Sequence, residues 1–154
     1  MIKSTVCYLI RNHEWLMLLR NKKENDVNQN KWIGVGGKMM KDETPYACMK
    51  REVFEETGLT VDCAQYCGIV HFHTPNYEDE EIYVYQTSDY HGDMHACDEG
   101  TLSYIPQDQV MSLSLWQGDR IFLQRMIDKQ IPFDITLHYD EDGTLIDTNE
   151  RGSN

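Results

Sequence analysis

The chain of 154 residues lacks any run of apolar residues long enough to cross a membrane. Its first residues, MIKSTVCYLIRNHEW, bring charge too early for the apolar core of a signal peptide. It also lacks internal repeats, a linker and low-complexity tracts. We therefore expect one globular domain over residues 1–154, with a frayed tail at 148–154, located in the cytoplasm.

Positive charge is scarce. Lys and Arg number 14 against 26 Asp and Glu, which gives a formal net charge of −12 at pH 7. A chain this acidic is not expected to wrap around a nucleic acid polymer, because the phosphate backbone calls for a basic groove. A small anionic substrate stays compatible with this charge when a divalent cation screens it locally.

Cysteines are few and are not arranged for a structural role. Five of them are scattered along the chain, at positions 7, 48, 63, 67 and 97. Cys63 and Cys67 have no second pair to complete a zinc site, and the number is odd. We expect free thiols in a reducing compartment.

A helix is predicted over residues 45–57 because both of its ends carry recognisable signals. Thr44 is suited to cap the first turn, and Pro45 tolerates the missing N–H there. Gly58 allows the left-handed conformation that ends many helices. The residues assigned to packing this helix on a sheet are Ala47, Met49, Val53 and Phe54.

This helix carries three glutamates on one face, since Glu52, Glu55 and Glu56 lie at positions i, i+3 and i+4. Their repulsion is relieved by a hard cation such as Mg²⁺, Mn²⁺ or Ca²⁺, which prefers carboxylate oxygen ligands. Arg51 can hold one carboxylate by a two-pronged hydrogen bond. Glycines within residues 34–37 allow a close backbone path and leave main-chain carbonyls to face a metal. The plainer alternative is a solvated acidic helix behind a glycine loop.

The spacing around this helix resembles the Nudix box, G-x5-E-x7-R-E-U-x-E-E-x-G-U, where U is a bulky aliphatic residue. The residues that match this pattern without a gap are Gly37, Glu43, Arg51, Glu52, Val53, Glu55, Glu56, Gly58 and Leu59. Seven fixed identities within 23 residues make the pattern highly specific, unlike a lone glycine motif.

The resemblance implies an α+β fold, an α/β/α sandwich with a mixed sheet between helices. It also implies hydrolysis of a nucleoside diphosphate linked to another moiety, with Mg²⁺ as cofactor and Mn²⁺ as a substitute. The metal ligands carried over are the carbonyl of Gly36 and the carboxylates of Glu52, Glu55 and Glu56, joined by Glu99 from a later loop. Arg51 and Glu43 would support and orient this catalytic group, whose general base is left unassigned.

Beyond the box, the chain is similar to MutT-type nucleoside triphosphate pyrophosphohydrolases, including those that remove oxidised purine nucleotides such as 8-oxo-dGTP. The similarity runs from LMLLRNKK through KWIGVGGK to LWQGD. Trp116 and Asp119 match two residues that line the base pocket in the oxidised-purine branch. Gly118 stands in place of a second aspartate and Ile33 in place of an asparagine, so the choice of base is less firmly implied than the chemistry.

Two lysines are candidate contacts of substrate phosphates. Lys22 belongs to a cluster with Arg20 and Lys23 at the end of a predicted strand, and Lys38 follows the glycines. Blunting of an edge strand by charge explains the cluster equally well. The polar loop at residues 24–31 could order on binding.

The rest of the chain supplies strands and a second helix. The strands are predicted at residues 4–10, 15–19, 32–35, 59–63, 66–72, 82–87, 102–105, 133–139 and 144–147. An acidic turn is predicted at 74–81, a hairpin turn rather than a calcium loop at 140–143, and a short helical turn at 106–110. A helix within 115–129, capped by Asp119, should pack on the face of the sheet opposite the glutamates.

Strand parity brings either Phe72 or the pair His71 and His73 into the pocket, and the sequence does not decide between them.

Two other functions fit the same box. Cleavage of ADP-ribose or a nucleotide sugar would call for further acidic or proline features downstream, which are not clear in this chain. A non-catalytic nucleotide sensor usually lacks box glutamates, and here all of them are present. The partner is a small nucleotide in each case, and the oligomeric state cannot be read from the sequence.

Overall fold

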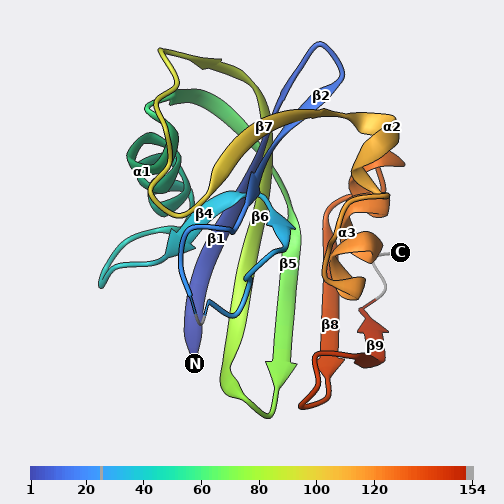
Figure 1. Cartoon of the computed structure of the whole chain (residues 1–154). Helices are drawn as coiled ribbons and strands as arrows, with labels where there is room; N and C mark the ends of the chain where they lie inside the picture. Colours follow the sequence, from blue (N-terminus) through green and yellow to red (C-terminus); the bar gives the residue numbers. More distant parts are fainter. Residues whose placement is uncertain (25, 152–154) are drawn as a thin grey trace.

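The computed structural model describes residues 1–24 and 26–151. Across these residues, nine strands form one mixed sheet between α1 on one face and α2 and α3 on the other (Figure 1). This is the predicted α+β sandwich. The elements are β1 (Ile2–Arg11), β2 (Glu14–Leu19), β3 (Trp32–Ile33), β4 (Val35–Lys38), α1 (Pro45–Thr57), β5 (Thr60–Thr74), β6 (Tyr77–His91), β7 (Thr101–Pro106), α2 (Gln107–Val110), α3 (Gln117–Ile127), β8 (Phe133–Tyr139) and β9 (Leu145–Glu150).

The sheet is organised around β1. Its strand order is β3-β2-β1-β6-β5-β8-β9, with β4 also paired to β1 and β7 to β2. The pairs β1–β6 and β5–β8 are parallel, whereas the other pairs are antiparallel. Strand β2 pairs with the end of β1, where Leu9 faces Leu16, and β4 pairs with its beginning, where Thr5 faces Gly37. Strand β4, which carries Gly36 and Gly37, is thereby fixed beside α1.

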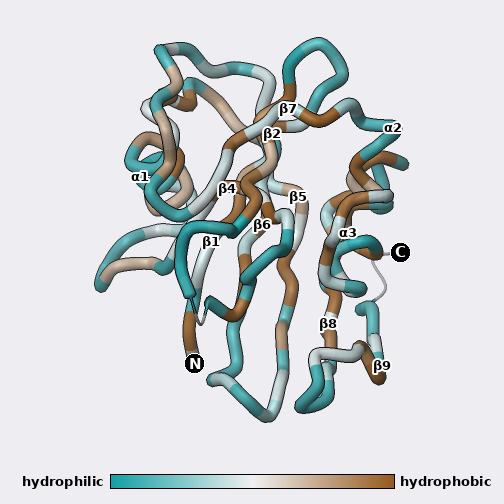
Figure 2. Tube along the Cα trace, viewed as in Figure 1, coloured by the Kyte–Doolittle hydropathy of each residue, from teal (hydrophilic) through white to brown (hydrophobic). Residues whose placement is uncertain are grey.

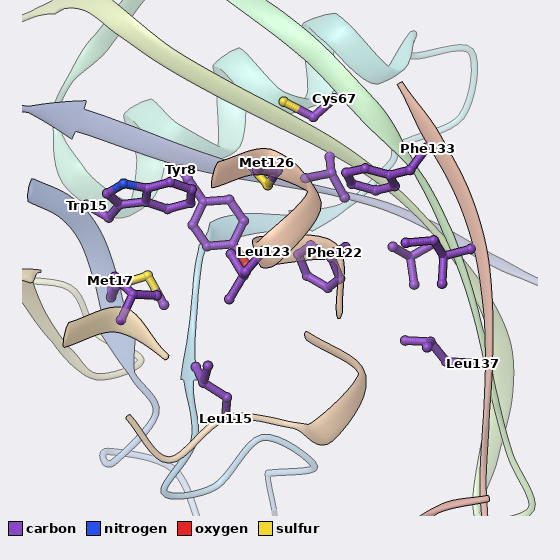
Figure 3. Close-up of a cluster of buried hydrophobic side chains, with 14 of the residues drawn as sticks. Tyr8, Trp15, Met17, Cys67, Leu115, Phe122, Leu123, Met126, Phe133 and Leu137 are labelled. Atoms are coloured by element: carbon purple, nitrogen blue, oxygen red, sulfur yellow. The ribbon is translucent and has the colours of Figure 1, made fainter. Parts of the chain in front are cut away.

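Residues of β1 alternate between two cores, as expected for a strand covered on both faces. Cys7 and Leu9 pack in the core beneath α1, whereas Tyr8 packs in the core beneath α3. Figure 3 shows the second core, in which Phe122 and Leu123 of α3 meet Tyr8. Hydropathy along the chain agrees, since the hydrophobic stretches follow the sheet and α3 and the loop tips are hydrophilic (Figure 2). The prediction that the two helices lie on opposite faces is confirmed.

Helix α1 has the predicted limits and the predicted caps. Thr44 Oγ1 accepts a hydrogen bond from Ala47 N at 3.1 Å. Gly58 adopts φ 81° and donates its N–H to Phe54 O at 2.8 Å. The predicted packing face was partly wrong: Met49 and Val53 are buried, but Ala47 is exposed and Phe54 is 56% exposed. Cys48 and Thr57 are buried instead.

Several predicted boundaries were wrong, mostly because strands continue through polar sequence. The acidic segment 74–81 is largely strand, since β5 reaches Thr74 and β6 begins at Tyr77. The predicted strands 59–63 and 66–72 are one strand, β5, interrupted by register shifts. Strand β9 continues to Glu150, where Arg125 Nη2 pairs with the Glu150 carboxylate at 2.9 Å, so 148–150 is not frayed. Residues 152–154 lie outside the described residues.

The loop between β8 and β9 is a tight hairpin turn, as predicted. Asp140 Oδ1 accepts hydrogen bonds from the N–H groups of Asp142 and Thr144, each at 2.9 Å. Its carboxylate therefore serves the backbone of the turn.

All five cysteines are free thiols. No helix within the described part of the chain combines the length and the apolar character needed to cross a membrane.

Candidate functional site

Arg51 organises the acidic face of α1. Its Nε and Nη2 donate to the two oxygens of Glu43 at 2.7 and 2.9 Å, which is the predicted two-pronged bond. Its Nη1 donates to Glu52 at 2.8 Å and to Glu55 at 3.1 Å. The hydrogen bond from Arg51 lowers the pKa of Glu43 to about 2. One guanidinium therefore holds three of the predicted catalytic carboxylates in fixed positions.

Glu56 lies between strand β4 and Glu99. Its Oε2 accepts a hydrogen bond from Gly36 N at 3.0 Å, and its carboxyl group contacts that of Glu99. Burial, followed by the hydrogen bond and charge of Glu99, raises the pKa of Glu56 to about 9. Burial opposes ionisation of Glu99 as well, but its contacts with Glu56, Arg20 and Lys23 outweigh it and leave its pKa below the usual value. Each carboxyl group therefore affects the ionisation of the other, and that of Glu56 is disfavoured.

This donor set fits a hard divalent cation by its chemistry. Its ligands are oxygens, and the Glu56–Glu99 contact brings together two acidic groups that a cation would stabilise. Within residues 1–24 and 26–151, no three His, Cys, Asp or Glu side chains already converge as a ligand group. Arg51 donates to one oxygen of Glu52 and one of Glu55, and the Gly36 N–H donates to one oxygen of Glu56.

The glycines are explained by close approach rather than by unusual backbone angles. A Cβ on Gly37 would lie 2.5 Å from the carboxyl carbon of Glu52. A Cβ on Gly36 would overlap the backbone carbonyl of Thr5 in β1. Strand β4 can therefore lie directly against both β1 and the glutamates of α1.

The two predicted phosphate contacts lie at the border of the acidic cluster. Lys22 Nζ donates to the carbonyl of Cys97 at 2.7 Å, in the loop that carries Glu99. Lys38 ends β4 with an exposed side chain, and its carbonyl accepts from Arg51 Nη2 at 3.2 Å. Their role toward phosphate stays a prediction.

An aromatic wall lies on the α3 side of the sheet, formed by Phe72, Trp116 and Tyr139. The ring centroid of Trp116 is 5.9 Å from Phe72 and 5.1 Å from Tyr139. The structure thus places Phe72, and not the histidines, beside Trp116. His71 and His73 point to the opposite face and pair with Asp134 at 3.0 Å and Asp79 at 2.9 Å.

Asp119 lies in the first turn of α3, but it does not cap the helix as predicted. The helix begins at Gln117, Trp116 is the N-cap residue, and no side chain makes the capping bond. Burial raises the pKa of Asp119 to about 7, opposed in part by the charges of Lys31 and Arg120. Although part of its surface is accessible, its carboxyl group is thus surrounded by protein.

Gly118 leaves no room for the second aspartate of the related pocket. Its N–H donates to the hydroxyl of Tyr139 at 2.7 Å, and a Cβ would lie 2.6 Å from that oxygen. The close packing of Tyr139 therefore explains why this chain has a glycine at position 118.

Replacing Asp119 with Asn should stabilise the fold at alkaline pH. A carboxyl whose pKa rises from 3.8 to about 7 on folding loses stability as the pH increases between those values. The variant does not lose this stability as the pH increases. We therefore expect the difference in the free energy of unfolding between variant and wild type to be about 1–3 kcal/mol larger, in favour of the variant, at pH 8 than at pH 4. Urea unfolding of both proteins across this range measures the difference, and parallel pH profiles would contradict the prediction.

Three residues of this region were not predicted from the sequence. Asn28 Oδ1 accepts a hydrogen bond from Trp116 Nε1 at 2.8 Å, and Lys31 Nζ lies 5.7 Å from the centre of the Trp116 ring. Tyr139 completes the aromatic wall. The sequence contains one signal for this region, the polarity of the 24–31 loop. No spacing rule links residue 28 to residue 116, so their contact could not be predicted.

Two cavities of the described residues lie away from this site. A cavity of about 600 Å³ is lined by Ile10, Trp15, Gln107, Met126 and other residues, none of which was predicted to be functional. The location of the candidate site therefore depends on the carboxylates and the aromatic wall.

Comparison with known proteins identifies the family of the chain. The family described as the NUDIX domain matches residues 1–126. Two relatives named oxidized purine nucleoside triphosphate hydrolase come from Danio rerio and Mus musculus. They are 27% and 26% identical over 114 residues, which is 73% of this chain and 73% of each relative.

Solved structures share the fold. A MutT protein from Bacillus halodurans superposes with a TM-score of 0.87 at 23% identity, covering 97% of both chains. A MutT protein from Methanosarcina mazei Go1 gives a TM-score of 0.74 at 25% identity, covering 85% of this chain and 96% of its own.

Proposed function

The chain belongs to the Nudix family as a MutT-type hydrolase of phosphoanhydride bonds, and on this basis we propose that it cleaves a nucleoside triphosphate to a monophosphate and pyrophosphate. The observation that carries the proposal is the contact of Glu56 with both Gly36 N and Glu99, beside the carboxylates held by Arg51. We also propose that residues 1–154 act as one domain.

Cleavage of a triphosphate needs neutralised phosphate oxygens, an activated water and an in-line approach to phosphorus. The residues proposed to hold Mg²⁺, or Mn²⁺ in its place, are the carbonyl of Gly36 and the carboxylates of Glu52, Glu55, Glu56 and Glu99. The cation would supply positive charge to the phosphates and lower the pKa of a water. Arg51 and Glu43 keep Glu52 and Glu55 oriented, and a carboxylate of the cluster accepts the proton from water.

Substrate binding is proposed to use both ends of the site. Lys22 and Lys38 lie beside the carboxylates and would meet the phosphates. Trp116 and Phe72 offer aromatic surface for a base, and Asp119 offers a carboxyl group close by. Two relatives are named for oxidised purine nucleotides, so we propose 8-oxo-dGTP as the first substrate to test.

The free cysteines support a reducing setting such as the cytoplasm, where we propose that the reaction takes place.

A substrate panel tests the reaction class. We expect kcat/KM to be higher for nucleoside triphosphates and 8-oxo-dGTP than for ADP-ribose, a nucleotide sugar or diadenosine polyphosphates, with pyrophosphate as product. The reaction should stop when Mg²⁺ is removed by chelation and resume when Mg²⁺ or Mn²⁺ is added. A clear preference for ADP-ribose would refute the proposed substrate class. Tight nucleotide binding without turnover would favour a sensor.

A further inference from the structure

The hydrogen bond between Asn28 and Trp116 fixes the orientation of the Asn28 amide. An indole N–H can only donate, so the oxygen of the amide must face Trp116, at 2.8 Å. The two N–H donors of Nδ2 then point away from the indole. Within residues 1–24 and 26–151, that nitrogen donates to no protein group, since the side-chain bond of Asn28 is made by its oxygen. A half-buried amide beside an aromatic wall therefore retains two donors, while its oxygen accepts from Trp116.

The loop that carries Asn28 is anchored by a buried ion pair. Asp26, whose side chain is 7% exposed, accepts from Arg20 Nε at 2.7 Å and from the backbone N–H of Asn28 at 3.1 Å. The carbonyl of Asn28 accepts from Lys31 N at 2.9 Å, and Arg20 N donates to Lys31 O at 3.0 Å. These bonds fix the backbone on both sides of Asn28, so its amide is held in place before a ligand arrives.

The remaining donors limit what the amide can recognise. An asparagine pairs well with adenine when its oxygen accepts from the 6-amino group while its nitrogen donates to N7. Here the bond from Trp116 turns the oxygen toward the indole, so the side of the amide that faces away from the indole presents donors. Donors suit the 6-oxo group of a purine and leave a 6-amino group unpaired. Ile33 stands where the resemblance places a base-binding asparagine, and Asn28 can supply an amide from a different segment.

We propose that Asn28 is a specificity-determining residue that selects 6-oxopurine over 6-aminopurine nucleotides, positioned by the Arg20–Asp26 pair. This inference rests on the proposed function, because it concerns the base of the same triphosphate. Asp119 adds a carboxyl group on the neighbouring turn of α3, and Lys31 lies over the Trp116 ring.

The test compares dITP with dATP, which differ at the 6-position of the purine. Wild type should show a higher kcat/KM for dITP. Asn28→Asp keeps an oxygen for Trp116 and replaces the two donors with an acceptor, so the dITP to dATP ratio should fall by about tenfold to a hundredfold. Asn28→Ala, which removes the amide altogether, should lower the ratio with loss of dITP cleavage and no gain for dATP.

Asn30→Asp is the matched control, since it makes the same change two residues away on an exposed part of the loop. It should leave the ratio unchanged. Asp26→Asn should lower discrimination mainly through KM for dITP, with kcat largely retained, as expected for a positioning residue. Thermal unfolding of each variant checks that the fold is intact.

The outcomes separate this inference from the proposed function. If wild type releases pyrophosphate from neither nucleotide, the proposed function fails. If wild type cleaves triphosphates but shows no preference for dITP, or if Asn28→Asp leaves the preference intact, the inference about Asn28 is overturned while the proposed function stands.

Discussion

Replacing Glu56 with Gln should lower the rate of pyrophosphate release by about a thousandfold, the scale expected when a group that binds metal or transfers a proton is lost. Glutamine has nearly the same shape and can still accept the hydrogen bond from Gly36 N. It has no negative charge to hold a cation and cannot take a proton from water. The measurement is kcat for 8-oxo-dGTP or dITP at saturating Mg²⁺.

The fold itself should tolerate this replacement. Glu56 is largely surrounded by protein and touches a second carboxyl group, Glu99, so the acidic pair costs stability. We expect the thermal unfolding midpoint of Glu56→Gln to equal or exceed that of wild type. Glu141→Gln, in the hairpin turn after β8, makes the same chemical change far along the chain and should keep full activity. Equal rates for wild type and Glu56→Gln would refute the catalytic assignment.

The parts of the structure that were predicted correctly depend on local rules. The helix at 45–57 follows from Thr44, Pro45 and Gly58, whose effects reach only a few residues along the chain. The shared face of Glu52, Glu55 and Glu56 follows from the helical period alone. The two-pronged bond of Arg51 was also predictable in kind, although its partner proved to be Glu43, which precedes the helix.

The parts that were missed depend on how distant segments meet. Strand parity left Phe72 and its flanking histidines equivalent, and only the pairing of β5 with β6 and β8 decides which face they occupy. The Asn28–Trp116 bond joins residues 88 positions apart. Strand ends were misjudged for a related reason: the backbone of β6 and β9 pairs with a neighbour whether or not its side chains are polar.

The side-by-side glycines of β4 offer a second test with large effects, because the same substitution should fail for different reasons at the two positions. An added Cβ on Gly36 would overlap the carbonyl of Thr5. Backbone cannot move aside as a side-chain end can, so Gly36→Ala should separate β4 from β1. We expect the free energy of unfolding to fall by about 1–3 kcal/mol, the usual scale for overpacking.

An added Cβ on Gly37 meets the carboxyl end of Glu52 instead, at 2.5 Å. That end can rotate away if it gives up the 2.8 Å bond from Arg51, so Gly37→Ala should keep most of its stability. Moving a catalytic carboxylate by about 1 Å is expected to cost about a hundredfold in kcat. Urea unfolding and pyrophosphate release measured on both variants would separate the two effects. Wild-type activity in Gly37→Ala would show that the position of Glu52 does not matter for the reaction, and unchanged stability in Gly36→Ala would contradict the close contact with β1.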